Sequence, residues 1–236
     1  MNIFNIKIEF DHDAFRQSIE KCAADKDKGY VCVVDGNVLT MAQKDEAYRN
    51  IILNAYVNTC DGSSIATMCN KIYGTDYTAF TGPEIFAEYI EKSQFKQLLL
   101  GNTEEKYNQI KEKLEKEDKP CSHISYMPVP FAKIDEFDYE GIARQINEIK
   151  PDFIWVSLGA PKQENFCSRL LPFIDSGLLF GIGAAFNFYV GDIEQSRNIW
   201  FKRMFQEPKK QIKRCWNYLH AMPKIFREEK KRHNHK

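Results

Sequence analysis

The sequence lacks the long apolar segments and paired cysteines that mark membrane-spanning and disulfide-stapled proteins. No apolar run reaches the roughly 18 residues that a transmembrane helix needs. Residues 1–7 also lack the basic segment and apolar run of a signal peptide. The 7 cysteines are scattered and form no C-x-x-C pair, which argues against a disulfide framework and a zinc site. We therefore expect an intracellular protein.

Net charge is also absent, since 33 Lys and Arg balance 33 Asp and Glu. This balance argues against a dedicated nucleic-acid-binding protein. It conceals a split, however, because residues 200–236 hold 12 Lys or Arg and only 3 Asp or Glu, whereas the remaining chain holds 21 and 30. The body of the protein is thus acidic, and its C-terminal tail is basic.

The basic tail has the pattern of an interfacial helix. Apolar residues recur along it at intervals of mostly three to four: Met204, Phe205, Ile212, Trp216, Leu219, Met222 and Phe226. The cations between them predict contact with an anionic membrane surface, with packing on the body of the protein or in an oligomer interface as the alternative. Pro208 and Pro223 predict short, separate helices, and residues 228–236 are predicted to be disordered.

The rest of the chain alternates between strand and helix patterns. Apolar runs predict strands at 30–34, 55–60, 97–100, 123–127, 153–158 and 178–182, and an alternating pattern predicts a half-exposed edge strand at 4–10. Helices are expected at 38–53, 63–73, 83–92, 103–116, 139–149 and 162–171. This order predicts an α/β core of three layers with a mostly parallel sheet, over residues 1–195. Residues 196–236 form the basic amphipathic appendage of this scheme.

Ligands of such sheets bind at the carboxyl ends of the strands, beside helix N-termini. Four predicted strand ends carry polar residues or glycines, at 35–37, 60–64, 159–164 and 181–187. Each also has a structural explanation, such as an N-cap for Asp61 or close packing for Gly181 and Gly183. The sequence has no Walker A loop, and Phe186 interrupts the dinucleotide-binding G-x-G-x-x-G. The D-x-D patterns at 11–13 and 25–27 are too short to assign a metal site.

Five segments match one family in order and spacing. They are Asp61-Gly62, Thr81-Gly82, G-A-P-K-Q-E at 159–164, G-I-G-A-A-F-N-F-Y-V-G at 181–191 and W-F-K-R-M-F-Q-E-P at 200–208. Together they resemble the WecG/TagA/CpsF family of bacterial glycosyltransferases (glycosyltransferase family 26), over about residues 3–216. The resemblance implies a Rossmann-like fold with a C-terminal appendage that completes the site at the membrane.

The resemblance also implies a reaction. Members of the family move an N-acetylmannosamine-type sugar from a UDP donor to a polyprenyl-diphosphate-linked sugar, with inversion and without a required metal or other cofactor. The setting is the synthesis of teichoic acid, capsule or common antigen, by a peripheral protein on the inner face of the cytoplasmic membrane. The implied partners are therefore the UDP-sugar, the lipid-linked acceptor, an anionic membrane surface and a second copy of the chain.

Inverting transfer needs a base for the acceptor hydroxyl, and Asp61 at a strand end is the candidate. Backbone N–H groups and cations must offset the charge of the departing diphosphate. The residues expected to bind substrate are Asp35, Asn37, Gly62, Thr81, Gly82, Gly159, Pro161, Lys162, Gln163, Glu164, Gly181, Gly183, Asn187, Arg203 and Arg214. For Arg203 and Arg214, a solvated basic face of the tail is the alternative.

Three positions depart from the family pattern. Asp35 stands where members usually carry Thr, Ala79 where many carry Arg, and Asn187 where Asp occurs; the segment 191–207 is also shorter. The first two changes make the pocket less positive. They imply a different donor sugar, reduced activity, or a non-catalytic nucleotide-sugar-binding or partner subunit of a polysaccharide assembly complex. A dinucleotide enzyme is a further alternative, but it predicts a glycine fingerprint where residues 35–37 are D-G-N.

Overall fold

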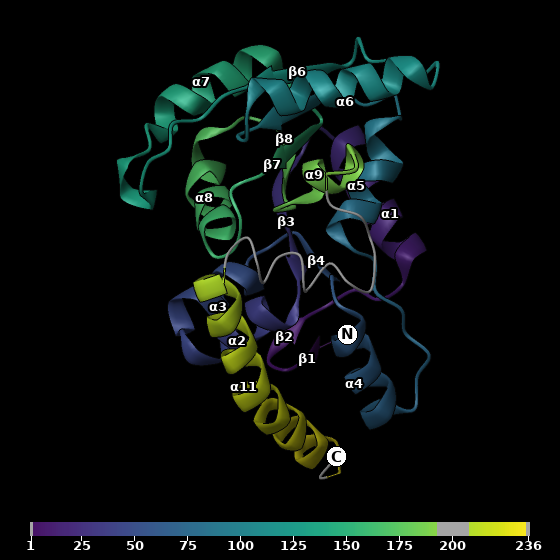
Figure 1. The fold of residues 1–236 in the computed structure, drawn as a ribbon, viewed down its shortest axis with the longest axis vertical. Coiled ribbons are helices and arrows are strands. Elements are labelled where there is room, and N and C mark those ends of the chain that lie inside the picture. Colours follow the sequence, from purple (N-terminus) through teal and green to yellow (C-terminus); the bar gives the residue numbers. More distant parts are fainter. Residues whose placement is uncertain (1, 193–207, 235–236) are drawn as a thin grey trace.

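The computed structural model describes residues 2–192 and 208–234, and gives only the backbone of 208–211, 213–215 and 217. Six strands form one parallel sheet in the order β4-β3-β8-β7-β5-β6. They are β3 Lys28–Val34, β4 Val57–Cys60, β5 Gln97–Leu100, β6 Ile124–Met127, β7 Phe153–Val156 and β8 Gly177–Gly181. Figure 1 shows helices on both sides of this sheet, and the predicted parallel α/β fold is confirmed.

Successive residues of each strand face opposite layers of helices. In β7, Ile154 and Val156 pack into one hydrophobic core, while Phe153 and Trp155 pack into the other. The first core lies under α2 Gly36–Lys44, α3 Glu46–Leu53, α4 Ser63–Tyr73, α7 Tyr139–Ile149, α8 Lys162–Leu170 and α11 Pro208–Asn234. The second lies under α1 His12–Ala24, α5 Gly82–Ile90, α6 Glu104–Lys116 and α9 Ala185–Tyr189. Short 3-10 helices at Ile134–Glu136 and Leu171–Phe173 join these elements.

The helix predicted at 38–53 is two helices. The predictions for 63–73, 97–100 and 139–149 agree with the structure to the residue, but α2 and α3 meet at Asp45, whose backbone is extended (φ −125°, ψ 112°). The Asp45 carboxylate accepts a hydrogen bond from the Tyr48 N–H at 3.1 Å. Asp45 therefore ends one helix and caps the next, which the apolar spacing alone does not show.

The predicted edge strand at 4–10 is a short hairpin instead. β1 Asn2–Ile3 pairs antiparallel with β2 Ile6–Lys7, across a turn in which Phe4 and Asn5 have positive φ (51° and 62°). Positive φ at both central residues suits the twist of a hairpin. The segment also covers the core rather than standing half exposed, because all of its apolar side chains are buried: Ile3, Phe4, Ile6, Ile8 and Phe10.

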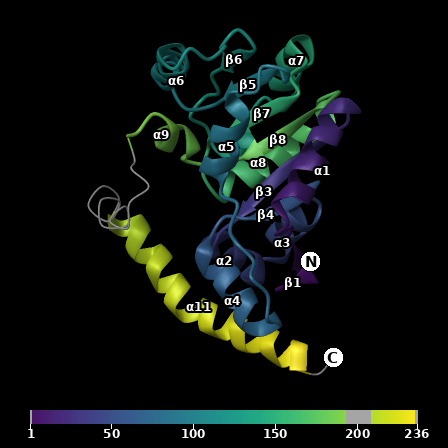
Figure 2. The ribbon, with the colours of Figure 1, turned by 90° about the vertical axis from the view of Figure 1, so that its right-hand side faces the viewer.

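Residues 208–234 of the tail form one continuous helix. α11 passes through Pro223 and ends at Asn234, so the predicted break at Pro223 and the predicted disorder of residues 228–234 are wrong. Met222 and Ile225 are buried in the core, and the Tyr73 hydroxyl donates to the buried Glu229 carboxylate at 2.6 Å. These contacts offset the backbone hydrogen bond that a proline forfeits. Figure 2 shows α11 running along α2 and α4.

The described residues also bear on membrane spanning, on the predicted domain boundary and on the cysteines. Within residues 2–192 and 208–234, no helix has the length and apolar character needed to cross a membrane. The predicted boundary between residues 195 and 196 lies outside the described residues. The six cysteines with described side chains are free thiols, and five of them are buried.

Candidate functional site

The carboxyl ends of β3 and β4 bring two aspartates to neighbouring positions. Asp61 directly follows β4, and its N–H donates to the Val34 carbonyl at the end of β3 (3.0 Å). Asp35 directly follows β3, and a Cβ built on Gly62 would lie 3.9 Å from the Asp35 Cα. The register of the two strands therefore places Asp35, Asp61 and Gly62 together at one edge of the sheet.

The start of α5 holds the Asp61 carboxylate. Asp61 Oδ1 accepts a hydrogen bond from the Gly82 N–H at 2.7 Å, so the half-buried carboxylate meets the positive end of a helix. Thr81 accepts from the Glu84 N–H (3.4 Å), and Glu84 Oε2 accepts from the Thr81 N–H (2.8 Å). This reciprocal capping fixes where α5 begins. The Thr81 side chain thus serves the helix, and Gly82 orients Asp61.

Asp35 caps α2, and α11 lies over the same helix end. Asp35 Oδ1 accepts from the N–H groups of Asn37 (2.9 Å) and Val38 (2.8 Å), as an N-cap does. The Asn37 side chain is half-buried. A Cβ built on Gly36 would lie only 2.5 Å from Cε2 of Tyr218 on α11. The C-terminal helix therefore borders the site next to Asp35.

Gln163 links the carboxyl ends of β7 and β8. Its side chain is buried, and its Oε1 accepts from the Gly159 N–H (3.0 Å). Its Nε2 donates to the Gly181 carbonyl (2.7 Å) and to Glu164 Oε1 (2.9 Å). A Cβ on Gly181 would lie 3.2 Å from the Gln163 Cγ, so the absence of a side chain at Gly181 leaves room for the Gln163 side chain. The hydrogen bonds of the Gln163 amide thus hold the turns around it.

Glu164 is a carboxyl group enclosed by the core beneath these turns. It is 1% exposed, and this burial raises its pKa to about 7, although the hydrogen bond from the Gln163 amide opposes the rise. The charge of Asp35 raises the pKa of Glu164 further. Burial also raises the pKa of the Tyr48 hydroxyl, which stays neutral. Glu164 therefore gains and loses its proton near neutral pH.

Similarity to known proteins decides the family. The sequence matches the family described as "Glycosyl transferase WecG/TagA/CpsF family" over residues 1–235. The chain belongs to this family. A relative in Bacillus subtilis (strain 168) is 22% identical over 92% of this chain and 87% of its own length. A second, in Staphylococcus aureus (strain NCTC 8325), is 23% identical over 83% and 78%. Both are named N-acetylglucosaminyldiphosphoundecaprenol N-acetyl-beta-D-mannosaminyltransferase.

The glycine-rich family stretch is supported by two polar residues that the sequence analysis did not single out. The Ser157 hydroxyl, directly after β7, donates to the Gly183 carbonyl at 2.7 Å. Asn102, just beyond β5, donates through Nδ2 to Ser157 Oγ at 3.3 Å. Their position after buried strands was the available signal. They stabilise the turn at Gly183, where φ is +57°, and Asn187 lies half-buried in the short helix that follows.

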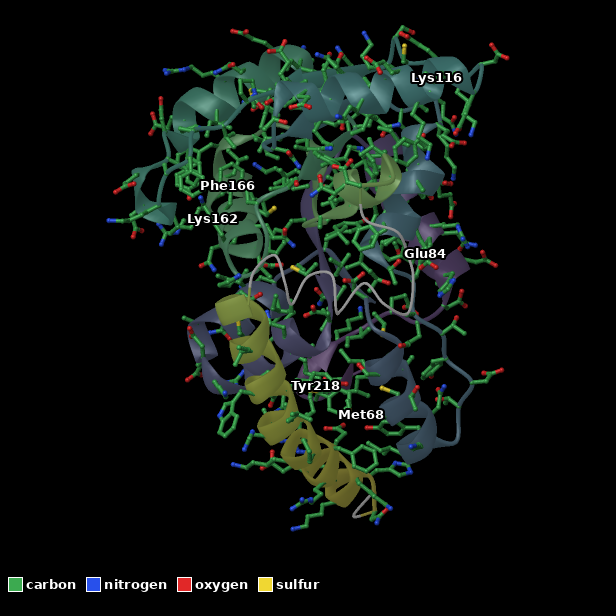
Figure 3. All side chains as sticks on the ribbon, viewed as in Figure 1. Met68, Glu84, Lys116, Lys162, Phe166 and Tyr218 are labelled. Atoms are coloured by element: carbon green, nitrogen blue, oxygen red, sulfur yellow. The ribbon has the colours of Figure 1, made fainter. Side chains whose placement is uncertain are left out.

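In the P-K-Q-E motif of the family, Lys162 lies against two aromatic rings. Its Nζ is 5.3 Å from the ring centre of Phe131 and 5.0 Å from that of Phe137, a cation–π arrangement. Figure 3 shows Lys162 and Phe166 together on α8. The preceding turn uses Gly159 at φ +75° and Pro161 at the start of the helix. The Lys162 charge is thus directed to the loop after β6, apart from the bonds of the Gln163 amide.

Arg203, Arg214 and the two D-x-D patterns are the remaining candidates from the sequence. Arg203 lies outside the described residues, and only the backbone place of Arg214 on α11 is described. Within residues 2–192 and 208–234, no three His, Cys, Asp or Glu side chains gather as a metal site requires. In the two D-x-D patterns, Asp11 caps α1 and Asp25 pairs with Lys21.

Proposed function

We propose that this protein is an inverting glycosyltransferase that moves an N-acetylmannosamine-type sugar from a UDP donor to a polyprenyl-diphosphate-linked sugar. Membership of the family supports glycosyl transfer. The names of the two relatives support the transferred sugar and the lipid-linked acceptor. The observation that carries the proposal is the half-buried Asp61 carboxylate, oriented at a strand end by the Gly82 N–H.

Asp61 acts as the general base of this reaction. As the acceptor oxygen bonds to the anomeric carbon, its proton passes to the Asp61 carboxylate. The bond between that carbon and the diphosphate oxygen breaks on the opposite face, and UDP departs with the electron pair. Attack opposite the leaving group inverts the anomeric centre, and Asp61 later returns the proton to solvent.

Backbone N–H groups stabilise the departing diphosphate in this proposal. The helix α4 begins without a side-chain N-cap, so N–H groups of its first turn are available to a ligand. The start of α4 follows Asp61 directly. Arg203 and Arg214 would add positive charge from the tail, and no metal or other cofactor is invoked.

We propose the cytoplasmic face of the membrane as the place of the reaction, in the synthesis of teichoic acid, capsule or common antigen. Support comes from α11, on which Ile212, Trp216 and Leu219 are 59%, 65% and 68% exposed. Apolar side chains on a basic helix favour binding at an anionic interface. The tail thus provides a route to a lipid-linked substrate.

A non-catalytic, nucleotide-sugar-binding subunit is the second candidate. Asp35 no longer favours it, because an Asp caps α2 as a Thr would. The observation that favours a non-catalytic subunit is Ala79, which stands where many family members carry Arg. Such a protein would bind UDP-sugar without releasing UDP.

Replacing Asp61 by Asn tests the role of the base. An Asn retains an oxygen that can accept from the Gly82 N–H, so the fold and UDP binding should persist. We expect UDP release from UDP-N-acetylmannosamine, with a short-chain lipid-diphosphate sugar acceptor, to fall by about 10²–10⁴-fold. Asp138→Asn is the matched control, since Asp138 is an exposed cap of α7. Unchanged turnover in Asp61→Asn would remove the base, and binding without turnover in the unaltered protein would favour the second candidate.

A further inference from the structure

An apolar groove lies between α4 and α11. It has a volume of about 280 Å³, and its lining includes Met68 and Lys71 of α4 and Tyr218, Leu219, Met222 and Phe226 of α11. Figure 3 shows Met68 and Tyr218 on the two helices that form its walls. Lys71 is the one charged side chain among these lining residues, and it is exposed. Among the side chains that the structure describes, the groove thus combines an apolar surface with the cation of Lys71.

Both walls of this groove approach the strand ends that carry the two aspartates. α4 begins two residues after Asp61, and Met68 lies about 9 Å along that helix from Gly62, at about 1.5 Å per residue. On the opposite wall, Tyr218 contacts Gly36, the residue that follows Asp35. The groove therefore leads from the strand ends outward between α4 and α11.

The groove is open to solvent along α11. Leu219 is 68% exposed although it lines the groove, and Trp216, one turn earlier on the same helix, is 65% exposed. Apolar surface of this kind gains free energy when a hydrocarbon covers it. A ligand with a flexible hydrocarbon chain and an anionic head matches both the apolar walls and Lys71.

We propose that this groove binds the isoprenoid chain of the acceptor lipid close to its diphosphate, while the acceptor sugar lies at Asp61. The inference rests on the proposed function, in which the acceptor is a sugar on a polyprenyl diphosphate. That molecule has its reacting hydroxyl and its hydrocarbon at opposite ends of a diphosphate. A groove whose apolar walls run outward from near the strand ends suits this order of groups. The tail helix thereby selects the lipid as well as approaching the membrane.

The test measures chain-length dependence in solution, without vesicles. Sugar acceptors on diphosphates with one or three isoprene units are compared, and binding of farnesyl diphosphate is measured directly by calorimetry. In the unaltered protein, we expect KM to fall at least about tenfold from one to three units, because each buried CH₂ adds to binding. Leu219→Asp should abolish this gain and weaken farnesyl diphosphate binding at least about tenfold, with KM for the UDP-sugar unchanged.

Ile212→Asp is the matched control. Ile212 is a similarly exposed apolar residue of α11 that does not line the groove, and its replacement should leave the chain-length dependence intact. Equal losses in both variants would overturn the proposal, because the chain-length dependence would then come from the exposed apolar face of α11 in general and not from the groove. A changed sedimentation of Leu219→Asp would overturn it in favour of a second copy in the groove. Because farnesyl diphosphate binding does not require turnover, failure of the groove is distinguished from failure of the transferase reaction.

Discussion

Replacing Glu164 by Gln should change how the stability of the protein depends on pH. Burial raises the pKa of Glu164 from 4.5 to about 7, so the folded protein holds this proton more tightly than the unfolded chain does. The free energy of unfolding therefore falls as pH rises from about 4.5 to about 7, and then levels off. Gln keeps the size of the side chain and an oxygen for the Gln163 amide, but carries no titrating proton.

The magnitude follows from the difference between the two pKa values. A gap of about 2.5 units, at about 1.4 kcal/mol per unit, destabilises the unaltered protein by about 3.5 kcal/mol well above pH 7, and by slightly more than about 3 kcal/mol at pH 8. At pH 5 only about 1 kcal/mol is lost, because the unfolded carboxyl is then only partly ionised. The buried thiols of Cys32 and Cys167 face Glu164, and burial holds their pKa values well above the ordinary range, so they stay neutral throughout.

Urea unfolding of both proteins at pH 5 and pH 8, under reducing conditions, measures this effect. Relative to the unaltered protein, Glu164→Gln should gain about 2 kcal/mol more at pH 8 than at pH 5. Glu112→Gln makes the same chemical change at an exposed position of α6 and serves as the control. An advantage of Glu164→Gln that is equal at the two pH values would refute the assignment of a near-neutral pKa to this carboxyl.

Two further predictions concern the end of α2. Gly36→Ala would place a Cβ 2.5 Å from the Tyr218 ring, so amide hydrogen exchange along α11 should quicken. In the control Gly62→Ala, the new Cβ would meet Ser64 Oγ at 3.6 Å, and exchange along α11 should stay unchanged. Slow exchange in both variants would contradict the contact between Gly36 and Tyr218. Asp35→Ala should lower the free energy of urea unfolding by about 1 kcal/mol through loss of the cap, and Asp35→Thr should restore most of it. Equal losses in these two variants would show that capping is not the role of Asp35.

The sheet could be predicted well because its signals are local. A strand buried on both faces is a continuous apolar run, as at 153–156, and helix ends carry their own caps, as Thr103 does for α6. The N-terminal hairpin was missed because alternating residues also suit a strand, and the positive φ of Phe4 and Asn5 is a weak sequence signal.

In the candidate site, too, local features could be predicted and contacts between distant elements could not. The position of Asp61 at a strand end was predictable, since a buried run precedes it and a helical pattern follows. Its hydrogen bond to Gly82 was not, because the two residues belong to separate elements that only the fold brings together. In the same way, Ser157 and Asn102 meet at Gly183 only through the order of the strands.

The sequence by itself determined the alternation of strands and helices, the family motifs and the separation of an acidic body from a basic tail. Tertiary structure alone decided that the Gln163 amide bonds to the backbone of two turns, and that residues 208–234 are one helix lying over α2 and α4. The reason is the separation along the chain over which each kind of signal acts. Periodicity and capping act over a few neighbouring residues, whereas the pairing of Tyr73 with Glu229 depends on where two distant segments pack.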